Sequence, residues 1–241
     1  MKRSYVAALL MVAVLAFSLG TLYPDSSSDG LKSMEGSGSA TAKIVAASKN
    51  SNTGAIGQVK VEIIPGDGDV LVETNPFIQT DTQVSATKAK EVAEEVVGKS
   101  LENHDVIYTI RMDSTVVGGP SAGAAMTLAT IAAMTDKEIR QEAVITGTIT
   151  ESGRIGKVGK IPVKAYAAGK AGIEDFYVPE GQSVKVNYEK VVERETDGFF
   201  VYRDVEYRPR KFNISAYTMR NFGMKTEEVG SIYQAMEKML K

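Results

Sequence analysis

A serine lies within a turn of small residues, Gly119-Pro120-Ser121-Ala122-Gly123. Residues 106–112 before it favour a strand, and the small apolar residues 124–133 after it predict a buried helix. Backbone N–H groups at a helix N-terminus have no partner within the helix and carry partial positive charge. A serine at this strand-to-helix passage can therefore act as a nucleophile, with N–H donors ready for a developing oxyanion.

The base that would activate this serine is not expected to be a histidine. The pattern G-x-S-x-G also fits the nucleophile elbow of α/β-hydrolases, but in that class the histidine follows the serine. The one histidine of this chain, His104, precedes Ser121 and lies in a polar run, Glu102-Asn103-His104-Asp105. We expect His104 to be a solvated loop residue.

The other usual partner of a nucleophilic serine is a lysine that is buried and therefore neutral near pH 7. Lys157 and Lys160 lie in a Gly-rich turn, where solvent would keep them charged. Lys164 lies in the first turn of a predicted helix, residues 162–171, that is rich in Ala and Val. Lys164 is therefore the candidate base. Taken alone, the segment fits equally well a lysine that extends from an alanine-rich helix into solvent.

Three motifs resemble the proteolytic domain of Lon proteases, and they occur in that family's order and spacing. They are the PSAG turn, the stretch Val144-Ile145-Thr146-Gly147-Thr148-Ile149-Thr150, and the segment from Gly153 to Lys164. The resemblance covers roughly residues 45–180. It implies that Ser121 is the nucleophile, that Lys164 is its base and that Thr146 lies beside the lysine. The rest of the turn would support the serine: Gly119, Pro120, Ala122 and Gly123.

Three positions depart from the pattern of that family. Gly118 stands where the family commonly has an acidic residue, three positions before the serine. Thr148 replaces the glutamate of the family's TGEIT motif, and Gly159-Lys160 replaces a Gly-Gly pair before the lysine helix. These changes concern how the serine loop is held. They leave the nucleophile and the base in place.

No cofactor, metal or nucleic acid is expected as a partner. The chain has a net charge of −2, one histidine and no cysteine. Although Lon proteases are usually driven by ATP, the glycine-rich segment is not a P-loop. Five residues separate Gly153 from Gly159, and Ile161 follows Lys160 where a P-loop has Ser or Thr. The resemblance is thus to an archaeal-like form that lacks the ATPase domain.

The N-terminal region predicts export. Residues 1–23 combine a basic start with an uncharged apolar run, which is typical of a signal peptide or of a short membrane anchor. Residues 24–41 are rich in Ser, Gly and Asp and predict a flexible linker. The positive flank should stay in the cytoplasm. We therefore expect the Lon-like domain, residues 42–241, to be outside the cytoplasm, either membrane-anchored or secreted.

The fold expected for this domain is α/β (α+β), a Lon-like mixed sheet with packed helices. Strands are predicted at 42–48, 56–64, 106–112, 142–150 and 176–178, with 70–72 returning as a hairpin after a turn at 65–69. A helix capped by Ser85 should bury a stripe made of Ala89, Val92, Ala93, Val96 and Val97. A final helix should bury Ile232, Met236 and Met239, together with Tyr233. Residues 183–212 have no counterpart in the family and predict an insertion or a β-hairpin flap.

Together these observations predict an ATP-independent serine endopeptidase that hydrolyses proteins or peptides with a Ser–Lys dyad. The resemblance also implies association into a homo-oligomer. Two alternatives stay open. One is a Ser–Lys peptidase of the signal-peptidase type, and the other is a catalytically inactive Lon-like module that binds partners outside the cytoplasm.

Overall fold

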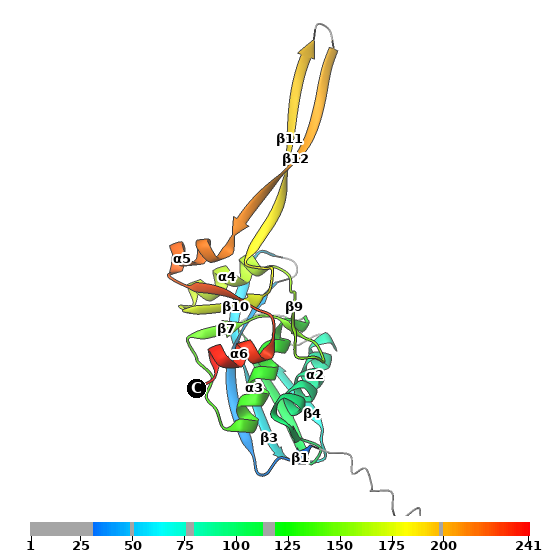
Figure 1. The fold of residues 1–241 in the computed structure, drawn as a ribbon, viewed down its shortest axis with the longest axis vertical. Coiled ribbons are helices and arrows are strands. Elements are labelled where there is room, and N and C mark those ends of the chain that lie inside the picture. The colour runs from blue at the N-terminus through cyan, green and yellow to red at the C-terminus, as the bar shows by residue number, and fades with distance from the viewer. Residues whose placement is uncertain (1–30, 49–50, 76–79, 113–118, 198–199) are drawn as a thin grey trace, which may run out of the picture. The chain divides into compact units, whose positions relative to one another are not determined.

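The computed structural model describes residues 31–48, 51–75, 80–112, 119–197 and 200–241 (Figure 1). The chain divides into two units, residues 1–32 and 33–241. The predicted N-terminal apolar segment, residues 1–23, lies outside the described residues, and so do residues 24–30 of the predicted linker and Gly118. Within the described ranges, no helix is long and apolar enough to cross a lipid bilayer.

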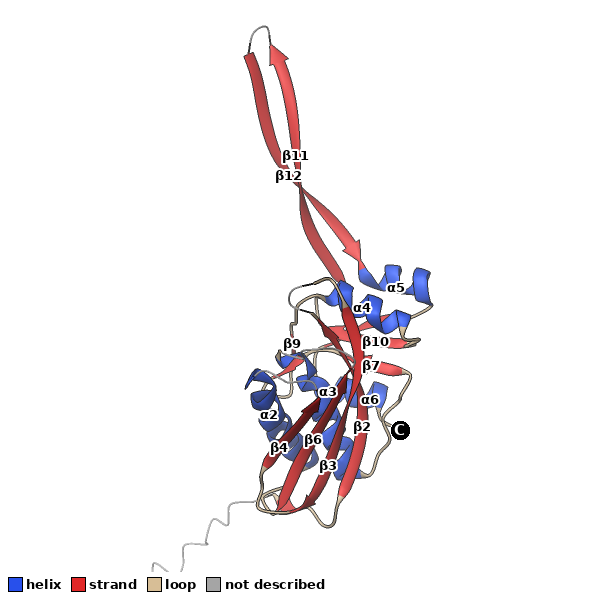
Figure 2. Ribbon diagram, turned by 180° about the vertical axis from the view of Figure 1, so that it is seen from behind, coloured by secondary structure: helices blue, strands red, loops and turns tan. Residues whose placement is uncertain are grey.

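A mixed four-stranded sheet forms one layer of unit 33–241, in the order β2-β3-β6-β4 (Figure 2). Its strands are β2 (Gly38–Ala47), β3 (Gly54–Pro65), β6 (His104–Met112) and β4 (Val70–Asn75). Alternate residues of β3 are fully buried, which is the period-2 pattern of a strand with one face on the core. β2 begins at Gly38, inside the segment assigned to the linker, because residues 38–41 already pair with β3.

The predicted hairpin between β3 and β4 is wrong. β4 pairs in parallel with β6, which separates it from β3. Both edges of β3 are occupied by antiparallel partners, β2 and β6. The turn after β3 is held by Asp105 Oδ1, which accepts the N–H groups of Asp67 at 2.9 Å and Asp69 at 3.0 Å. This carboxylate lies on β6 and fixes the chain where it enters β4.

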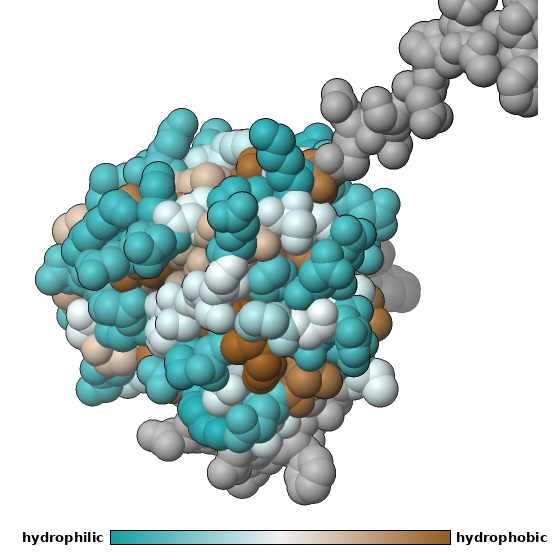
Figure 3. Space-filling view, turned by 90° about the horizontal axis from the view of Figure 1, so that it is seen from below, coloured by the Kyte–Doolittle hydropathy of each residue, from teal (hydrophilic) through white to brown (hydrophobic). Residues whose placement is uncertain are grey.

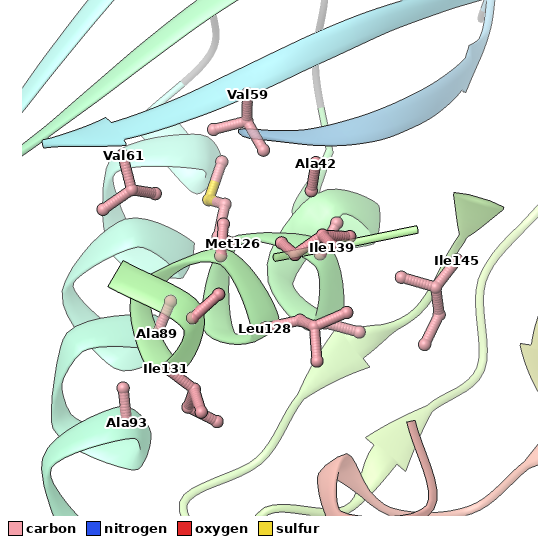
Figure 4. Packing of buried hydrophobic residues seen from close by; sticks show 14 of the residues in the cluster. Ala42, Val59, Val61, Ala89, Ala93, Met126, Leu128, Ile131, Ile139 and Ile145 are labelled. Atoms are coloured by element: carbon pink, nitrogen blue, oxygen red, sulfur yellow. The ribbon is translucent and has the colours of Figure 1, made fainter. Parts of the chain in front are cut away.

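Two helices cover the inner face of this sheet, α2 (Thr80–Val97) and α3 (Gly123–Thr135) (Figure 2). α3 is buried on nearly all sides, because its Ala, Thr and Met residues are small or adaptable enough to pack against both the sheet and α2. In Figure 4, Met126 of α3 lies near Val59 and Val61 of β3, Ile131 lies toward Ala89 and Ala93 of α2, and Leu128 lies on the other side of α3, toward Ile145. The predicted apolar stripe of α2 is buried at Ala89, Val92 and Ala93.

A second, parallel sheet has the order β13-β10-β7. Its strands are β7 (Ala143–Ile145), β10 (Asp175–Pro179) and β13 (Lys225–Val229). β7 and β10 are buried on both faces, whereas the edge strand β13 buries only Thr226 and Val229. Phe176 and Val178 pack in one core cluster with residues of α4 (Ile161–Lys170) and α5 (Ile214–Phe222). Tyr177 belongs to the other cluster, with α3 and α6 (Ile232–Met239).

The remaining elements are short, apart from one long hairpin. The short ones are β1 (Lys32–Ser33), β5 (Lys99–Ser100), the 3₁₀ turn η1 (Pro120–Ala122), β8 (Thr148–Ile149) and β9 (Ile155–Gly156). The hairpin consists of β11 (Val184–Asp197) and β12 (Phe200–Asn213). The residues predicted to be an insertion or a flap therefore form a two-stranded ribbon. Figure 3 shows another face of the molecule, which is largely hydrophilic with small groups of hydrophobic residues.

Other expectations also needed correction. His104 is not solvated: it is 5% exposed, and its Nε2 lies 2.9 Å from the carbonyl oxygen of Gly36, whose segment covers it. Ser85 does not cap α2, since the helix begins at Thr80 and Ser85 Oγ donates back to the Asp81 carbonyl within it. Tyr233 is exposed, because α6 buries its Ile232, Ala235 and Met239 side instead.

The Asp105 carboxylate gives a test of how the sheet order is held. Asp105→Ala removes the acceptor of two backbone N–H groups, so we expect the free energy of unfolding to fall by about 1–2 kcal/mol in urea denaturation. Asp67→Ala is the matched control, because it keeps the backbone N–H that Asp105 binds. A loss of equal size in both variants would contradict the assignment.

Candidate active site

Ser121 lies in the 3₁₀ turn η1, directly before α3. Gly119 precedes the turn with φ 101°, a left-handed conformation that favours glycine. Pro120 begins the turn, where its fixed φ is suitable and no N–H is needed. Gly123 begins α3 so close to β8 that a Cβ there would lie 3.1 Å from the Ile149 nitrogen. The two glycines thus allow a tight turn that leaves Ser121 half-buried.

A pocket of about 340 Å³ opens beside this turn. Ser121 and Lys164 both line it, together with Gly119 and Pro120 on one side. The segment Lys157–Lys160 lines the other side. The structure therefore brings the predicted nucleophile and the predicted base to one cavity, although they come from separate helices.

The Lys164 amine is buried against Thr146. Its side chain is 4% exposed, and Nζ lies 2.9 Å from Thr146 Oγ1, whose side chain is fully buried. Thr146 Oγ1 in turn donates to the carbonyl oxygen of Ser121 at 3.3 Å. A hydrogen-bonded path therefore runs from the lysine amine through the threonine hydroxyl to the backbone of the serine.

The strand predicted for residues 142–150 is interrupted at Thr146 and Gly147, where the chain bonds to the serine turn instead. It forms β7 and β8, with Thr146 and Gly147 between them. The N–H of Gly147 donates to the Ser121 carbonyl at 2.9 Å, and the N–H of Ala124 donates to the Gly147 carbonyl at 3.1 Å. These bonds replace sheet pairing and fasten the interrupted strand to the serine turn. Gly147 suits the place, because a Cβ there would lie 2.3 Å from Ile155 Cγ2.

Burial lowers the pKa of the Lys164 amine to about 8. The cause is desolvation, which disfavours the charged ammonium form. Among the described residues, no carboxylate forms an ion pair with it that would restore the charge. A lysine with this pKa is partly neutral near pH 7 and can accept a proton.

Asp81 is a residue of the site that the sequence analysis missed. It lies in the first turn of α2, and its Oδ1 accepts the N–H of Gly119 at 3.1 Å. A carboxylate from another helix thus holds the residue two positions before Ser121. No local motif indicates this contact, because the two residues meet only through the packing of α2 beside the serine turn.

Two of the three positions that depart from the Lon pattern, Lys160 and Thr148, lie within the described residues. Lys160 adopts a left-handed backbone conformation with φ 58°, which explains why a glycine suits this position. The side chain of Lys160 donates from Nζ to the backbone carbonyls of Ser48 and Ser51. Thr148 lines the pocket of Ser121. It also lines a neighbouring pocket of about 380 Å³, which shares Pro120.

Some predicted residues do not line the pocket. Ala122 and Gly123 lead from the turn into α3, and Thr146 lies behind the pocket wall, where it contacts Lys164. His104 is not part of the site either. No group of three or more His, Cys, Asp or Glu side chains suited to a metal ion occurs within the described ranges.

Comparison with known proteins gives consistent matches. Residues 40–198 match the Lon protease (S16) C-terminal proteolytic domain family. The chain is 36% identical to Lon protease 2 of Syntrophobacter fumaroxidans over 85 residues, 35% of the chain and 11% of that protein. It is 27% identical to Lon protease of Clostridium acetobutylicum over 133 residues, 54% of the chain and 17% of that protein. It is 31% identical to Lon protease of Phenylobacterium zucineum over 119 residues, 48% of the chain and 15% of that protein. The matches thus span a small part of these relatives.

The bond between Asp81 and Gly119 predicts that Asp81 positions the serine. Asp81→Ala should slow the reaction of Ser121 with a fluorophosphonate probe about tenfold, because the turn loses an anchor. Asp81→Asn should restore most of the rate, since its amide oxygen can accept the same N–H. Glu91→Ala, on the exposed side of α2, is the matched control. Equal rates in the Ala and wild-type proteins would contradict the role.

The pKa of Lys164 predicts a pH-dependent stability. Its pKa is about 8 in the folded chain and about 10.4 when unfolded, so burial of the amine costs about 3 kcal/mol below pH 8. Between these values the unfolded chain binds more protons, and wild-type stability should rise with pH. Lys164→Met removes the cost of about 3 kcal/mol but also loses a hydrogen bond that contributes about 1 kcal/mol, so its free energy of unfolding should be about 2 kcal/mol higher than that of the wild type at pH 7. Near pH 10.5 the amine is neutral in the folded chain and about half neutral in the unfolded chain, so this difference should disappear.

Urea denaturation of both proteins at pH 7 and pH 10.5 measures this effect. Lys170→Met, which removes an exposed lysine from the last turn of the same helix, controls for the loss of charge. The prediction fails if wild type and Lys164→Met show the same dependence of stability on pH.

Proposed function

The chain belongs to the Lon protease (S16) C-terminal proteolytic domain family, and on this basis we propose that it is a serine endopeptidase with a Ser121–Lys164 dyad. The observation that carries the proposal is the shared pocket, where a half-buried serine and a buried lysine with a lowered pKa meet. Desolvation keeps part of the amine in its neutral form near pH 7, and only this neutral form can accept the proton of a serine nucleophile.

In this mechanism Ser121 Oγ attacks the carbonyl carbon of a peptide bond, and the neutral Lys164 amine takes the serine proton. The resulting ammonium then gives that proton to the leaving amine, which leaves an acyl-enzyme. Lys164 then takes a proton from a water molecule, whose oxygen attacks the ester carbon, and the resulting ammonium returns this proton to Ser121 Oγ as the acyl–oxygen bond breaks. Lys164 thus acts as a base and then as an acid in each half of the reaction, which restores both residues.

Two features support this chemistry. Thr146 Oγ1 accepts a hydrogen bond from Lys164 Nζ and so fixes the amine on one side. The lone pair and the second N–H of the neutral amine then stay available for groups in the pocket. The Lys164 amine therefore needs no carboxylate for orientation. Backbone N–H groups of the serine turn are the proposed oxyanion donors, and each such donor typically contributes about 10²–10³ in rate.

The proposed substrates are proteins or peptides in extended form. The pocket next to that of Ser121 has walls from Val84 and Ile149 and shares Pro120 and Thr148 with it. A polypeptide that reaches Ser121 can therefore place an apolar side chain in this second pocket. No nucleotide-binding motif occurs in the sequence, which supports hydrolysis without ATP.

We propose that this activity is outside the cytoplasm, as a membrane-anchored or secreted domain. The support is the basic start and the apolar run of residues 1–23. A homo-oligomer is proposed as well, by analogy with the family. Fractionation of cells and protease accessibility of the domain in intact cells would test the location, and sedimentation would test the assembly.

The dyad predicts that two substitutions abolish peptidase activity. Ser121→Ala and Lys164→Met should each lower the cleavage of a labelled unfolded protein by at least about 10³-fold, without added ATP. Lys157→Met is the matched control, because this exposed lysine lines the same pocket and should keep most of the activity. Labelling of Ser121 by a fluorophosphonate probe would show an active nucleophile independently of substrate choice.

The pH profile separates the dyad from other mechanisms. Since the free amine is the active form, the rate should rise about tenfold from pH 7 to pH 9, through a pKa of about 8. A flat rate between pH 6 and pH 10 would contradict the role of Lys164. A folded protein that neither cleaves nor reacts with the probe would favour the inactive binding module.

A further inference from the structure

The ribbon β11–β12 has no partner among the strands that the structure describes. Figures 1 and 2 show it extending from the end of β10 and returning into α5. Each strand has 14 residues, about 45 Å at 3.3 Å per residue. An isolated two-stranded ribbon is only marginally stable in water, and its outer edges present unpaired backbone N–H and C=O groups. Such a ribbon is suited to receive a further strand.

The two faces of the ribbon differ in character. Directly opposite residues share a face, and the register places Tyr188 opposite Pro209, Lys190 opposite Tyr207 and Val192 opposite Val205. One face is therefore apolar although it is exposed: Val184, Val186, Tyr188, Val192, Val205, Tyr207 and Pro209. Tyr188 is 68% exposed and Tyr207 is 60% exposed. The opposite face carries the ion pairs Arg208–Glu206 and Arg210–Glu189.

The root of the ribbon is fastened to the wall of the Ser121 pocket. Gln182 lies just before β11, and its side chain binds both backbone groups of Val158. Its Oε1 accepts the Val158 N–H at 2.9 Å, and its Nε2 donates to the Val158 carbonyl at 2.7 Å. Val158 lines the pocket. The ribbon therefore begins close to the wall of the pocket in which the peptide bond would be cleaved.

The charges on the apolar face limit what can bind there. Within residues 184–192 and 205–213, this face carries Lys190 and Lys211 and no carboxylate. Two copies packed face to face would bring these cations together in an apolar contact, which is unfavourable. An apolar polypeptide segment with neutral or acidic neighbours matches the face in both hydropathy and charge.

We propose that the ribbon is a docking surface for extended, apolar segments of unfolded polypeptides, which it presents to the Ser121 pocket. The bound segment adds a strand to one edge of the ribbon, so that main-chain hydrogen bonds give affinity without requiring one sequence. Those of its apolar side chains that point to the same side pack beside the valines and tyrosines of the apolar face. This inference rests on the proposed peptidase function and adds to it a binding surface outside the Ser121 pocket.

The test uses the full chain with Ser121→Ala, so that binding is measured without cleavage. The probe is fluorescently labelled, reduced and carboxymethylated α-lactalbumin, a permanently unfolded acidic protein. Replacing Tyr188 and Tyr207 together by serine should raise its Kd at least tenfold by fluorescence anisotropy. The matched control replaces Lys185 and Arg210 on the opposite face by serine, and its Kd should change less than twofold. Thermal unfolding of each variant verifies that the core is intact.

A second measurement separates this inference from the proposed function. With Ser121 present, the ratio of cleavage of the unfolded protein to cleavage of a fluorogenic tetrapeptide should fall at least tenfold in the Tyr188/Tyr207 variant. An unchanged ratio in an active protein would overturn the docking surface and leave the peptidase standing. Tight binding by a chain that cleaves nothing would overturn the peptidase and leave the surface standing.

The other occupants of such a face give distinct results. Sedimentation would detect self-association, and anionic phospholipid vesicles would detect lipid binding. The proposal would be overturned if the Tyr188/Tyr207 variant lost either of these interactions but kept its affinity for the unfolded protein. The face would then belong to a second copy of the chain or to a lipid surface.

Discussion

The arrangement of the site depends on keeping one lysine amine out of water. Lys164 is buried and its pKa is lowered by desolvation, and among the described residues its amine donates a hydrogen bond to the hydroxyl of Thr146. Thr146 can hold the amine only because the strand that carries it is interrupted there and bends toward Ser121. The parallel sheet, the serine turn and the lysine helix are thus positioned relative to one another by a short path of hydrogen bonds through one buried threonine.

The site residues with local signals could be predicted from the sequence. Ser121 stands between strand-forming residues and a run of small apolar ones, and Lys164 is the lysine of its segment with apolar neighbours in a first helical turn. Both signals lie within a few residues of the side chain concerned. Both residues line the pocket of the folded chain. The family to which the chain belongs was also identified from these motifs, and the match over residues 40–198 confirms it.

Features that depend on distant partners could not be predicted. β4 pairs with β6 rather than β3, and Asp81 reaches Gly119 from another helix, because tertiary packing decides both contacts. His104 lies in a polar run, yet the segment around Gly36 covers it. The ribbon was expected as an insertion or a flap, but its two unlike faces become visible only when the register between its strands is known.

The buried amine has a consequence for which substitutions at position 164 can accumulate during evolution. Lys164 forms one hydrogen bond, to Thr146, that helps to position the elements of the site, but burial of its amine is expected to cost more stability than this bond contributes. In a lineage that had stopped cleaving peptides, chance replacements of Lys164 would strengthen the protein and would accumulate. Under the proposed mechanism, the amine supplies a chemistry that the surrounding alanines and valines cannot provide.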